Sequence, residues 1–279
     1  MEYLIYIALI AIILVIIACF IGNTVKHEGF TVPETNINAA ILFACFKINE
    51  HDYAFIEKWH NDIDFYVVVN GDPTEWDNKV IALIGSDRYM IRENKGYDVF
   101  AWKTGINTWR DKLNDYDLVG LVNNSCIYAF DLKDLFNKAY GYDMYGVYQH
   151  SGYPIAISSM LLARDRFLHS YFIIIGKRLF TSEDFTKYWD SKKKIRGHTQ
   201  AVLMHEKPFA KHFEKLGYRI GVYSCNIDYD WIHHEDRRPD NGVYHREFIK
   251  NKALKSNPKR FDRFKRNMGV KYIKVAADA

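Results

Sequence analysis

Two short polar segments contain the residue types that a ligand site needs. Asn94-Lys-Gly-Tyr-Asp98 carries a glycine and a carboxylate, and it directly precedes a helix-length segment, 99–109. Asn123-Asn-Ser125 directly follows an apolar run, 118–122. Gly96 lets the backbone approach a ligand closely, and Asp98 can accept hydrogen bonds from hydroxyl or amino groups of that ligand. Alternatively, Asp98 caps the helix that begins at residue 99.

The elements around these segments predict an α/β fold with a mostly parallel sheet flanked by helices. Val99, Trp102, Ile106 and Trp109 recur at the spacing of one buried helix face. Apolar runs that predict buried strands alternate with such helical segments, which is typical of βαβ units. The predicted strands are 39–46, 64–70, 88–91, 118–122, 170–175 and 218–224, and the predicted helices are 53–59, 99–109, 182–189 and 208–216. In open α/β sheets ligands bind beyond the carboxyl ends of the strands, so we expect Asp98 and Asn123 to lie close together there.

Composition and hydropathy divide the 279 residues into an anchor, a globular domain and a basic end. Hydrophobic residues make up 48% of the chain and aromatic residues 16%, enough for a sizeable core, which argues against wholesale disorder. Residues 3–22 carry no charge and are long enough to cross a bilayer as a helix. We therefore predict a single-pass membrane protein with an uncleaved anchor. The alternative is a cleaved signal peptide, which normally has a basic leading segment and a shorter apolar region. Its parts are a transmembrane anchor at 1–25, a linker at 26–38, a globular domain at 39–226 and a basic region at 227–279.

The net charge of +4 conceals a strongly basic segment. Residues 237–274 contain 13 lysines and arginines but three acidic residues. Such a segment can lie against anionic lipid headgroups, balance a diphosphate, or be a solvated helical surface. No nucleic-acid-binding module accompanies the charge, so a nucleic-acid partner is not expected.

Several segments together resemble a known family. These segments occur in the order seen in the rhamnan-synthesis F family of glycosyltransferases. They are Asn94 to Asp98, Asp115 to Ser125, Tyr145-Gly-Val, Leu168 to Ile175, His205-Glu206 and Gly217-Tyr-Arg-Ile220. More distantly, they are similar to family-2 glycosyltransferases with the GT-A fold. The resemblance implies a GT-A-type domain over 39–226. It also implies an inverting transfer of a sugar from a nucleotide-sugar donor to a glycan or glycoconjugate acceptor in polysaccharide synthesis.

The resemblance also assigns residues to the donor site. The nucleotide-sugar pocket would be lined by Asn94, Gly96, Asp98, Asn123, Asn124 and Ser125. Lys103, one turn into the helix, would contact phosphate. Glu206 takes the place of the second acid of the Glu-Asp pair of family-2 enzymes, and this acid is the catalytic base. Alternatively, Glu206 is an acid stabilised by the N-terminus of the helix that starts near Pro208. His169 and His205 are weaker predictions for contacts with the acceptor or the donor sugar, and His169 is alternatively structural.

The metal ion is the open question at sequence level. GT-A enzymes usually hold Mn²⁺ or Mg²⁺ with an Asp-x-Asp at the position of Asn123-Asn-Ser125, and the rhamnan-synthesis relatives commonly have Asn-Asp-Ser. This chain has no carboxylate there. Three outcomes remain: a metal ion held elsewhere, for example by Asp228-Tyr-Asp230 with His233-His234; a diphosphate neutralised by basic residues; or a non-catalytic glycan-binding or scaffolding protein.

Overall fold

The computed structural model describes residues 37–128, 131–150, 167–193, 195–225 and 248–250. The predicted membrane span, residues 3–22, lies outside the described residues, as does nearly all of the basic region from 227 onward. None of the helices in the described part of the chain is both long and apolar enough to cross a bilayer. The Asp228-Tyr-Asp230 and His233-His234 segment also lies outside the described residues.

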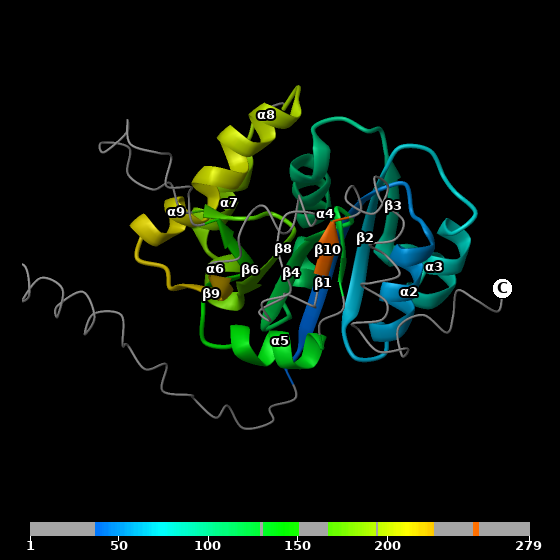
Figure 1. Ribbon diagram of the computed structural model, residues 1–279, viewed down its shortest axis with the longest axis horizontal. Helices are drawn as coiled ribbons and strands as arrows, with labels where there is room; N and C mark the ends of the chain where they lie inside the picture. The colour runs from blue at the N-terminus through cyan, green and yellow to red at the C-terminus, as the bar shows by residue number, and fades with distance from the viewer. Residues whose placement is uncertain (1–36, 129–130, 151–166, 194, 226–247, 251–279) are drawn as a thin grey trace, which may run out of the picture. The chain divides into compact units, whose positions relative to one another are not determined.

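An eight-stranded sheet forms the centre of the domain, with seven strands in the order β3-β2-β1-β4-β8-β6-β7 and β9 paired with β6 (Figure 1). Strands β1 to β4 run parallel, as do β6 and β9, which confirms the predicted mostly parallel sheet. Strand β8, however, is antiparallel to both of its long neighbours, β4 and β6. The strands are β1 (Ala39–Phe46), β2 (Asp64–Asn70), β3 (Tyr89–Arg92), β4 (Leu118–Asn123), β6 (Met144–His150), β7 (Phe167–Leu168), β8 (Phe172–Gly176) and β9 (Ile220–Cys225). A separate two-stranded sheet pairs β5 (Cys126–Tyr128) with β10 (Phe248–Lys250).

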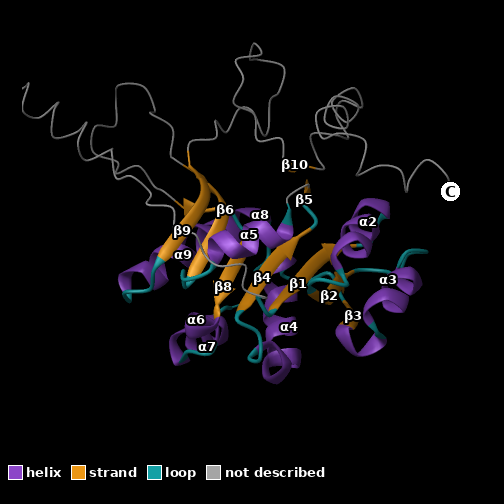
Figure 2. Cartoon of the chain, turned by 90° about the horizontal axis from the view of Figure 1, so that it is seen from below, coloured by secondary structure: helices purple, strands orange, loops and turns teal. Residues whose placement is uncertain are grey.

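Helices cover both faces of the large sheet (Figure 2). On one face lie α2 (Glu50–Trp59), α3 (Asp77–Ile84) and α5 (Leu132–Ala139); on the other lie α4 (Tyr97–Leu113), α6 (Lys177–Phe180), α7 (Glu183–Asp190) and α9 (Lys207–Lys215). Along β1, Ile41 and Phe43 enter the first core, whereas Ala40 and Leu42 enter the second. A strand buried on both faces needs apolar residues at every position, which explains the unbroken apolar runs in the sequence.

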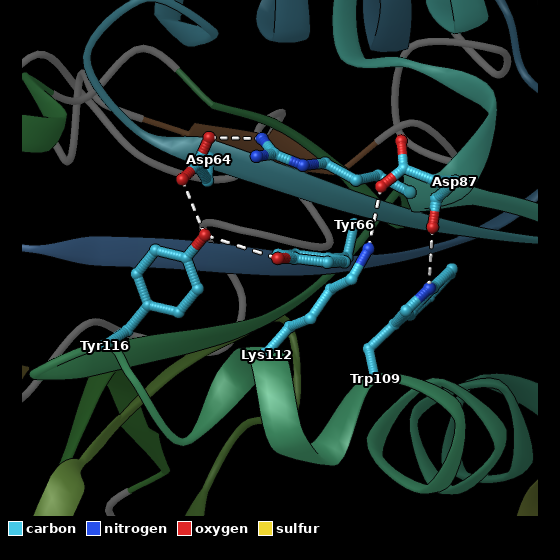
Figure 3. A network of polar contacts seen from close by, with 7 residues as sticks. Asp64, Tyr66, Asp87, Trp109, Lys112 and Tyr116 are labelled. Carbon is cyan, nitrogen blue, oxygen red and sulfur yellow. Dashed lines mark hydrogen bonds and ion pairs between the residues drawn. The ribbon is translucent and has the colours of Figure 1, made fainter.

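A polar network holds the C-terminal end of α4 at the amino-terminal edge of the sheet (Figure 3). The Tyr116 hydroxyl donates a hydrogen bond to Asp64 Oδ2, at the start of β2, at 2.6 Å. Arg88 forms an ion pair with the same carboxylate. On α4, Lys112 Nζ lies 2.7 Å from Asp87 Oδ2, and Trp109 Nε1 donates to the Asp87 carbonyl at 2.9 Å. The backbone of α4 is kinked at Trp109, and the hydrogen bond of Trp109 holds the end of the straight segment whose first turn carries Asp98 at the opposite edge.

Replacing Asp64 with alanine is expected to lower the free energy of unfolding by about 1–3 kcal/mol. The substitution leaves the partly buried Tyr116 hydroxyl and Arg88 guanidinium without their shared acceptor. Urea unfolding followed by circular dichroism measures the change. Asp62→Ala is the matched control, because Asp62 pairs with the exposed Lys133 at the surface and should cost less than about 1 kcal/mol. Equal effects of the two substitutions would contradict a structural role for the network.

Candidate functional site

Asp98 and Asn123 lie together at the carboxyl edge of the sheet, as predicted. Asn123 Nδ2, at the end of β4, donates a hydrogen bond to Asp98 Oδ2, in the first turn of α4, at 2.8 Å. The same amide nitrogen lies 3.3 Å from the carbonyl oxygen of Ser170. Asn123 is almost fully buried, with 2% of its surface exposed, so its amide holds these two partners in place and orients Asp98.

Glu206 joins this network from the other side of Ser170. Its Oε1 accepts hydrogen bonds from the Ser170 backbone N–H at 3.0 Å and from the Ser170 hydroxyl at 3.3 Å. His169 Nδ1 lies 3.1 Å from the same oxygen, a contact that the sequence did not predict. The His169 ring stacks on Tyr171 with 4.8 Å between ring centroids, which fixes its orientation. We call Asp98, Asn123, His169, Ser170 and Glu206 the carboxyl-edge network.

The antiparallel direction of β8 explains why Ser170 belongs to this network. Val122, near the end of β4, pairs with Phe172, the first residue of β8. The residues immediately before β8 therefore reach the edge of the sheet where β4 ends. A parallel β8 would have placed them at the opposite edge. Nothing in the sequence around 170 distinguishes the two directions, so Ser170 was not a predicted site residue.

Burial and a neighbouring carboxylate make Asp98 a weak acid in the folded protein. The pKa of Asp98 is raised to about 7, chiefly by burial; the hydrogen bond from Asn123 opposes this rise, and the nearby Glu206 carboxylate adds to it. A carboxyl group with a pKa near 7 is partly protonated at neutral pH. Near neutral pH, Asp98 can therefore either donate or accept a hydrogen bond.

The loop before α4 adopts a conformation that requires Gly96. Gly96 is the N-cap residue of α4 and has φ +80°, in the left-handed region. A Cβ atom at this position would lie 2.6 Å from Cγ of Phe100, so even alanine would clash. The alternative role of Asp98 as helix cap is wrong, because α4 starts at Tyr97 and no side chain caps it. The Asp98 carboxylate is instead engaged by Asn123.

Asn124 and Ser125 belong to the turn after β4 and make structural contacts. Asn124 Oδ1 accepts the Phe46 backbone N–H at 3.3 Å, and Asn124 Nδ2 donates to Asp52 Oδ2 at 3.1 Å. Ser125 N–H donates to Asn123 Oδ1 at 3.0 Å. Asp52 is buried, burial raises its pKa to about 7, and it forms a capping box with Asn49 at the start of α2. Asp52 was not a predicted site residue, although Asn49-x-x-Asp52 matches the pattern of a capping box.

The Asn123-Asn-Ser125 turn does not fit a divalent cation. It carries no carboxylate, and the side-chain oxygens of both asparagines already accept backbone N–H groups. Mn²⁺ and Mg²⁺ favour carboxylate oxygens. Across the described ranges, no three His, Cys, Asp or Glu side chains cluster closely enough to hold a metal ion. The chemistry proposed below therefore rests on side chains alone.

Glu206 lies at the end of a π-helical turn, Val202–Glu206, which follows α8 (His198–Ala201) and continues into α9. Glu206 is the N-cap residue of α9 but makes no capping hydrogen bond to it, and the alternative of an acid stabilised by the helix N-terminus stays a prediction. Lys192 Nζ donates to the Met204 carbonyl at 3.0 Å and lies over the Tyr188 ring, which ties the turn to the residues after α7. Wide turns of this kind often occur at functional sites, because they redirect side chains within a helix.

His205 points into the core rather than toward the network. It is 1% exposed, and its Nδ1 lies 3.1 Å from the Tyr188 hydroxyl. Its ring lies near those of Trp189 and Phe209. Burial lowers the pKa of His205 to about 3, so the ring is neutral at physiological pH. The predicted sugar contact has no support in this geometry and stays a sequence-based prediction.

Lys103 and Asn94 have no described contact with the carboxyl-edge network. Lys103 Nζ donates to the carbonyls of Asp190 and Lys192, at 3.2 and 3.3 Å, and so ties α4 to the C-terminal end of α7. Asn94 is exposed in the loop that leads to Gly96. Their roles in donor binding remain predictions.

The fold and the network define an α/β protein whose mostly parallel, helix-flanked sheet fits the GT-A type. The profile of the family described as rhamnan synthesis protein F matches residues 65–259, well over half of the chain. The chain belongs to the rhamnan synthesis protein F family. In general terms, this places it among glycosyltransferase-type proteins that use nucleotide sugars.

Two solved structures are similar in outline. A crystal structure described as a nucleotide-diphospho-sugar transferase from Desulfovibrio desulfuricans shares 16% identity over 81% of this chain and 97% of that chain, with a TM-score of 0.41. The apo form of the glycosyltransferase GlyE from Streptococcus pneumoniae shares 13% identity over 76% of this chain and 54% of that chain, with a TM-score of 0.37. No curated protein matches the chain significantly.

Proposed function

We propose that the chain transfers a sugar from a nucleotide-sugar donor to a glycan acceptor, with inversion at the anomeric carbon. The carboxyl-edge network supports this proposal most strongly, because it places Asp98 and Glu206 around Asn123 and Ser170 in a member of the rhamnan synthesis protein F family. The donor would lie against the Gly96 loop and the end of β4. Asp98 would bind a hydroxyl or amino group of the nucleotide.

In this mechanism Glu206 is the general base. Its carboxylate takes the proton of the attacking acceptor hydroxyl while the acceptor oxygen bonds to the anomeric carbon and the bond to the diphosphate breaks. The N–H and hydroxyl of Ser170 and the ring of His169 hold the carboxylate in one orientation. Such restraint favours reaction, since a base acts only within hydrogen-bond reach of the proton it removes.

The raised pKa of Asp98 suits a site that must accept a diphosphate. An ionised Asp98 beside Glu206 would repel the phosphate oxygens, and the turn after β4 supplies no positive charge. A protonated Asp98 removes one negative charge and adds a hydrogen-bond donor. Lys103 and the basic residues of 237–274 are the further proposed sources of positive charge.

We also propose that the protein acts at a membrane. The uncharged residues 3–22 would anchor it as a single-pass protein, and the basic residues 237–274 would lie against anionic headgroups. Both proposals rest on sequence alone, and the side of the membrane is left open.

Thermal shift with nucleoside diphosphates and their sugars tests the proposed donor site. A bound ligand stabilises the folded protein, by about 2.7 kcal/mol at a hundredfold excess over its Kd, so at least one nucleotide should raise the Tm. The shift should be lost in Asn123→Ala but retained in Asn107→Ala, an exposed asparagine on α4. Parallel measurements with and without Mn²⁺ report metal dependence. No shift with any nucleotide would contradict the donor site.

The second candidate function is a non-catalytic glycan-binding or scaffolding protein. The chemistry of the turn after β4 favours it. The turn has Asn124 and no carboxylate, and the Asn124 amide is engaged in hydrogen bonds with Phe46 and Asp52. Nucleotide or glycan binding without transfer in a broad donor panel would support this alternative.

A further inference from the structure

A hollow of about 350 Å³ opens at the amino-terminal edge of the sheet, opposite the carboxyl-edge network. The turn between α5 and β6, Tyr140 to Asp143, forms one wall, and the junction of β8 with α6, Gly176 to Arg178, forms another. Asp117 and Leu118, at the start of β4, and Arg219, just before β9, complete it. Its volume lies within the range of small-molecule sites, about 300–1,000 Å³. Neither Asp98 nor Glu206 lines it, so the proposed transfer reaction does not use it.

The hollow has positive charge that its own carboxylates do not neutralise. Asp143 is buried, and Arg178 holds it with two hydrogen bonds, one of them from Nε at 2.7 Å. The Arg219 backbone N–H donates to the same carboxylate at 2.7 Å. Although burial opposes it, these contacts keep the pKa of Asp143 below its usual value. Asp143 is therefore an internal partner of Arg178, and its charge is already balanced.

Lys177 and Arg219 are not paired in this way, although the charge of Arg219 also helps to lower the pKa of Asp143. In the described part of the chain, neither forms an ion pair; Lys177 Nζ reaches only the Asp115 carbonyl, at 3.3 Å. The Arg219 guanidinium lies 4.7 Å from the centroid of the Tyr142 ring, which holds it in the wall of the hollow. A flat guanidinium and an ammonium group that line one hollow are suited to a phosphate, which accepts several charge-assisted hydrogen bonds.

The remaining lining is suited to a sugar. Tyr140 is 48% exposed at the rim, and the Tyr142 ring lies beside Arg219. Such rings present flat apolar surfaces on which the C–H face of a sugar can pack. Asp117 is exposed and can accept hydrogen bonds from sugar hydroxyls. Gly141, in the wall of the hollow, has φ +84° and no atom within 4 Å of its Cβ position apart from its chain neighbours.

We propose that this hollow is a second binding site, for a phosphorylated sugar. Lys177 and Arg219 would bind the phosphate, Tyr140 and Tyr142 would pack against the sugar ring, and Asp117 would accept a hydroxyl hydrogen bond. A free sugar phosphate and a phosphate-bearing unit of a glycan chain share this chemistry. The assignment does not depend on the proposed transfer reaction, because its residues lie at the other edge of the sheet.

Isothermal titration of the full chain with glucose 1-phosphate, glucose and inorganic phosphate tests the site. Glucose 1-phosphate should bind more tightly than either of the other two, and its affinity should fall as salt is raised. Arg219→Gln and Lys177→Gln should each weaken it by about tenfold or more, the loss of one charge-assisted contact. Lys79→Gln removes a charge from α3, which lies over the other end of the sheet, and should leave the affinity unchanged. Titration with a phosphodiester-linked disaccharide distinguishes the two sources: tighter binding than glucose 1-phosphate assigns a glycan chain, and weaker binding assigns a free sugar phosphate.

Three results would overturn the proposal. Unchanged affinity in Arg219→Gln and Lys177→Gln is the first. Equal affinities for inorganic phosphate and glucose 1-phosphate would remove the sugar from the assignment. Loss of binding in Asn123→Ala, with Arg219→Gln unaffected, would place the ligand at the carboxyl-edge network. Failure of the parent protein to bind any nucleotide would instead count against the proposed donor site and leave this one intact.

Discussion

Glu206→Gln should lower kcat for sugar transfer by about 10²- to 10⁴-fold while nucleotide binding persists. Glutamine keeps the shape of the side chain, and its carbonyl oxygen can still accept the Ser170 N–H that Glu206 accepts at 3.0 Å. It cannot take the proton of an acceptor hydroxyl. Folding and the donor site should therefore survive while the chemical step slows.

A transfer assay with the nucleotide sugars that stabilise the parent protein measures this effect. Glu214→Gln is the matched control, because Glu214 is exposed on α9, eight positions further along the chain. A rate near that of the parent in Glu206→Gln would show that Glu206 is not the base. If the parent itself transfers no sugar from any donor of a broad panel, the non-catalytic alternative is the better account.

Asp98→Asn should make the protein more stable at pH 8 and flatten its dependence on pH. In the unfolded chain an aspartic acid has a pKa near 3.9, whereas in the folded protein burial raises the pKa of Asp98 to about 7. Between these values the folded state binds more protons than the unfolded state. The free energy of unfolding therefore falls as pH rises from about 4 to about 7, and the loss is complete above 7.

Asparagine carries no charge at any pH and so removes this loss. At pH 8 the variant should be more stable than the parent by about 1–3 kcal/mol, and at pH 4 the two should be similar. Urea unfolding across this pH range measures both differences. Asp52, whose pKa burial also raises to about 7, contributes a slope of the same sign, so Asp52→Asn with Asp98→Asn should flatten the profile further. If the unfolding free energy of Asp98→Asn depends on pH as steeply as that of the parent, Asp98 is ionised in the folded protein at acidic pH.

The sequence predicted the part of the site that follows from strand ends and local pattern. The glycine loop before a helix and the polar residues after an apolar run were enough to bring Asp98 and Asn123 together, because parallel strands end at one edge. Glu206 was found through the family resemblance rather than through local pattern. The structure shows it bound to Ser170, in a π-helical turn that no residue pattern signalled.

What the sequence missed depends on long-range pairing. The direction of β8 decides whether Ser170 lies at the site, and an apolar run looks the same in either direction. The hollow beside Arg219 is likewise assembled from four separate segments of chain. Lys103 shows the opposite case: its position on α4 was predicted, but its contacts with the residues after α7 could not be.

Helix α4 makes the site sensitive to changes made far from it. The helix is kinked at Trp109, and the segment before the kink forms a rod about 20 Å long, with Trp109 at one end and Asp98 near the other. If the hydrogen bond from Trp109 to the Asp87 carbonyl loosened and this segment pivoted by about 5°, its first turn would move by about 2 Å. Such a shift would break the 2.8 Å hydrogen bond from Asn123 to Asp98. Substitutions at the amino-terminal edge can therefore change ligand affinity at the carboxyl edge, even where no residue of the carboxyl edge is altered.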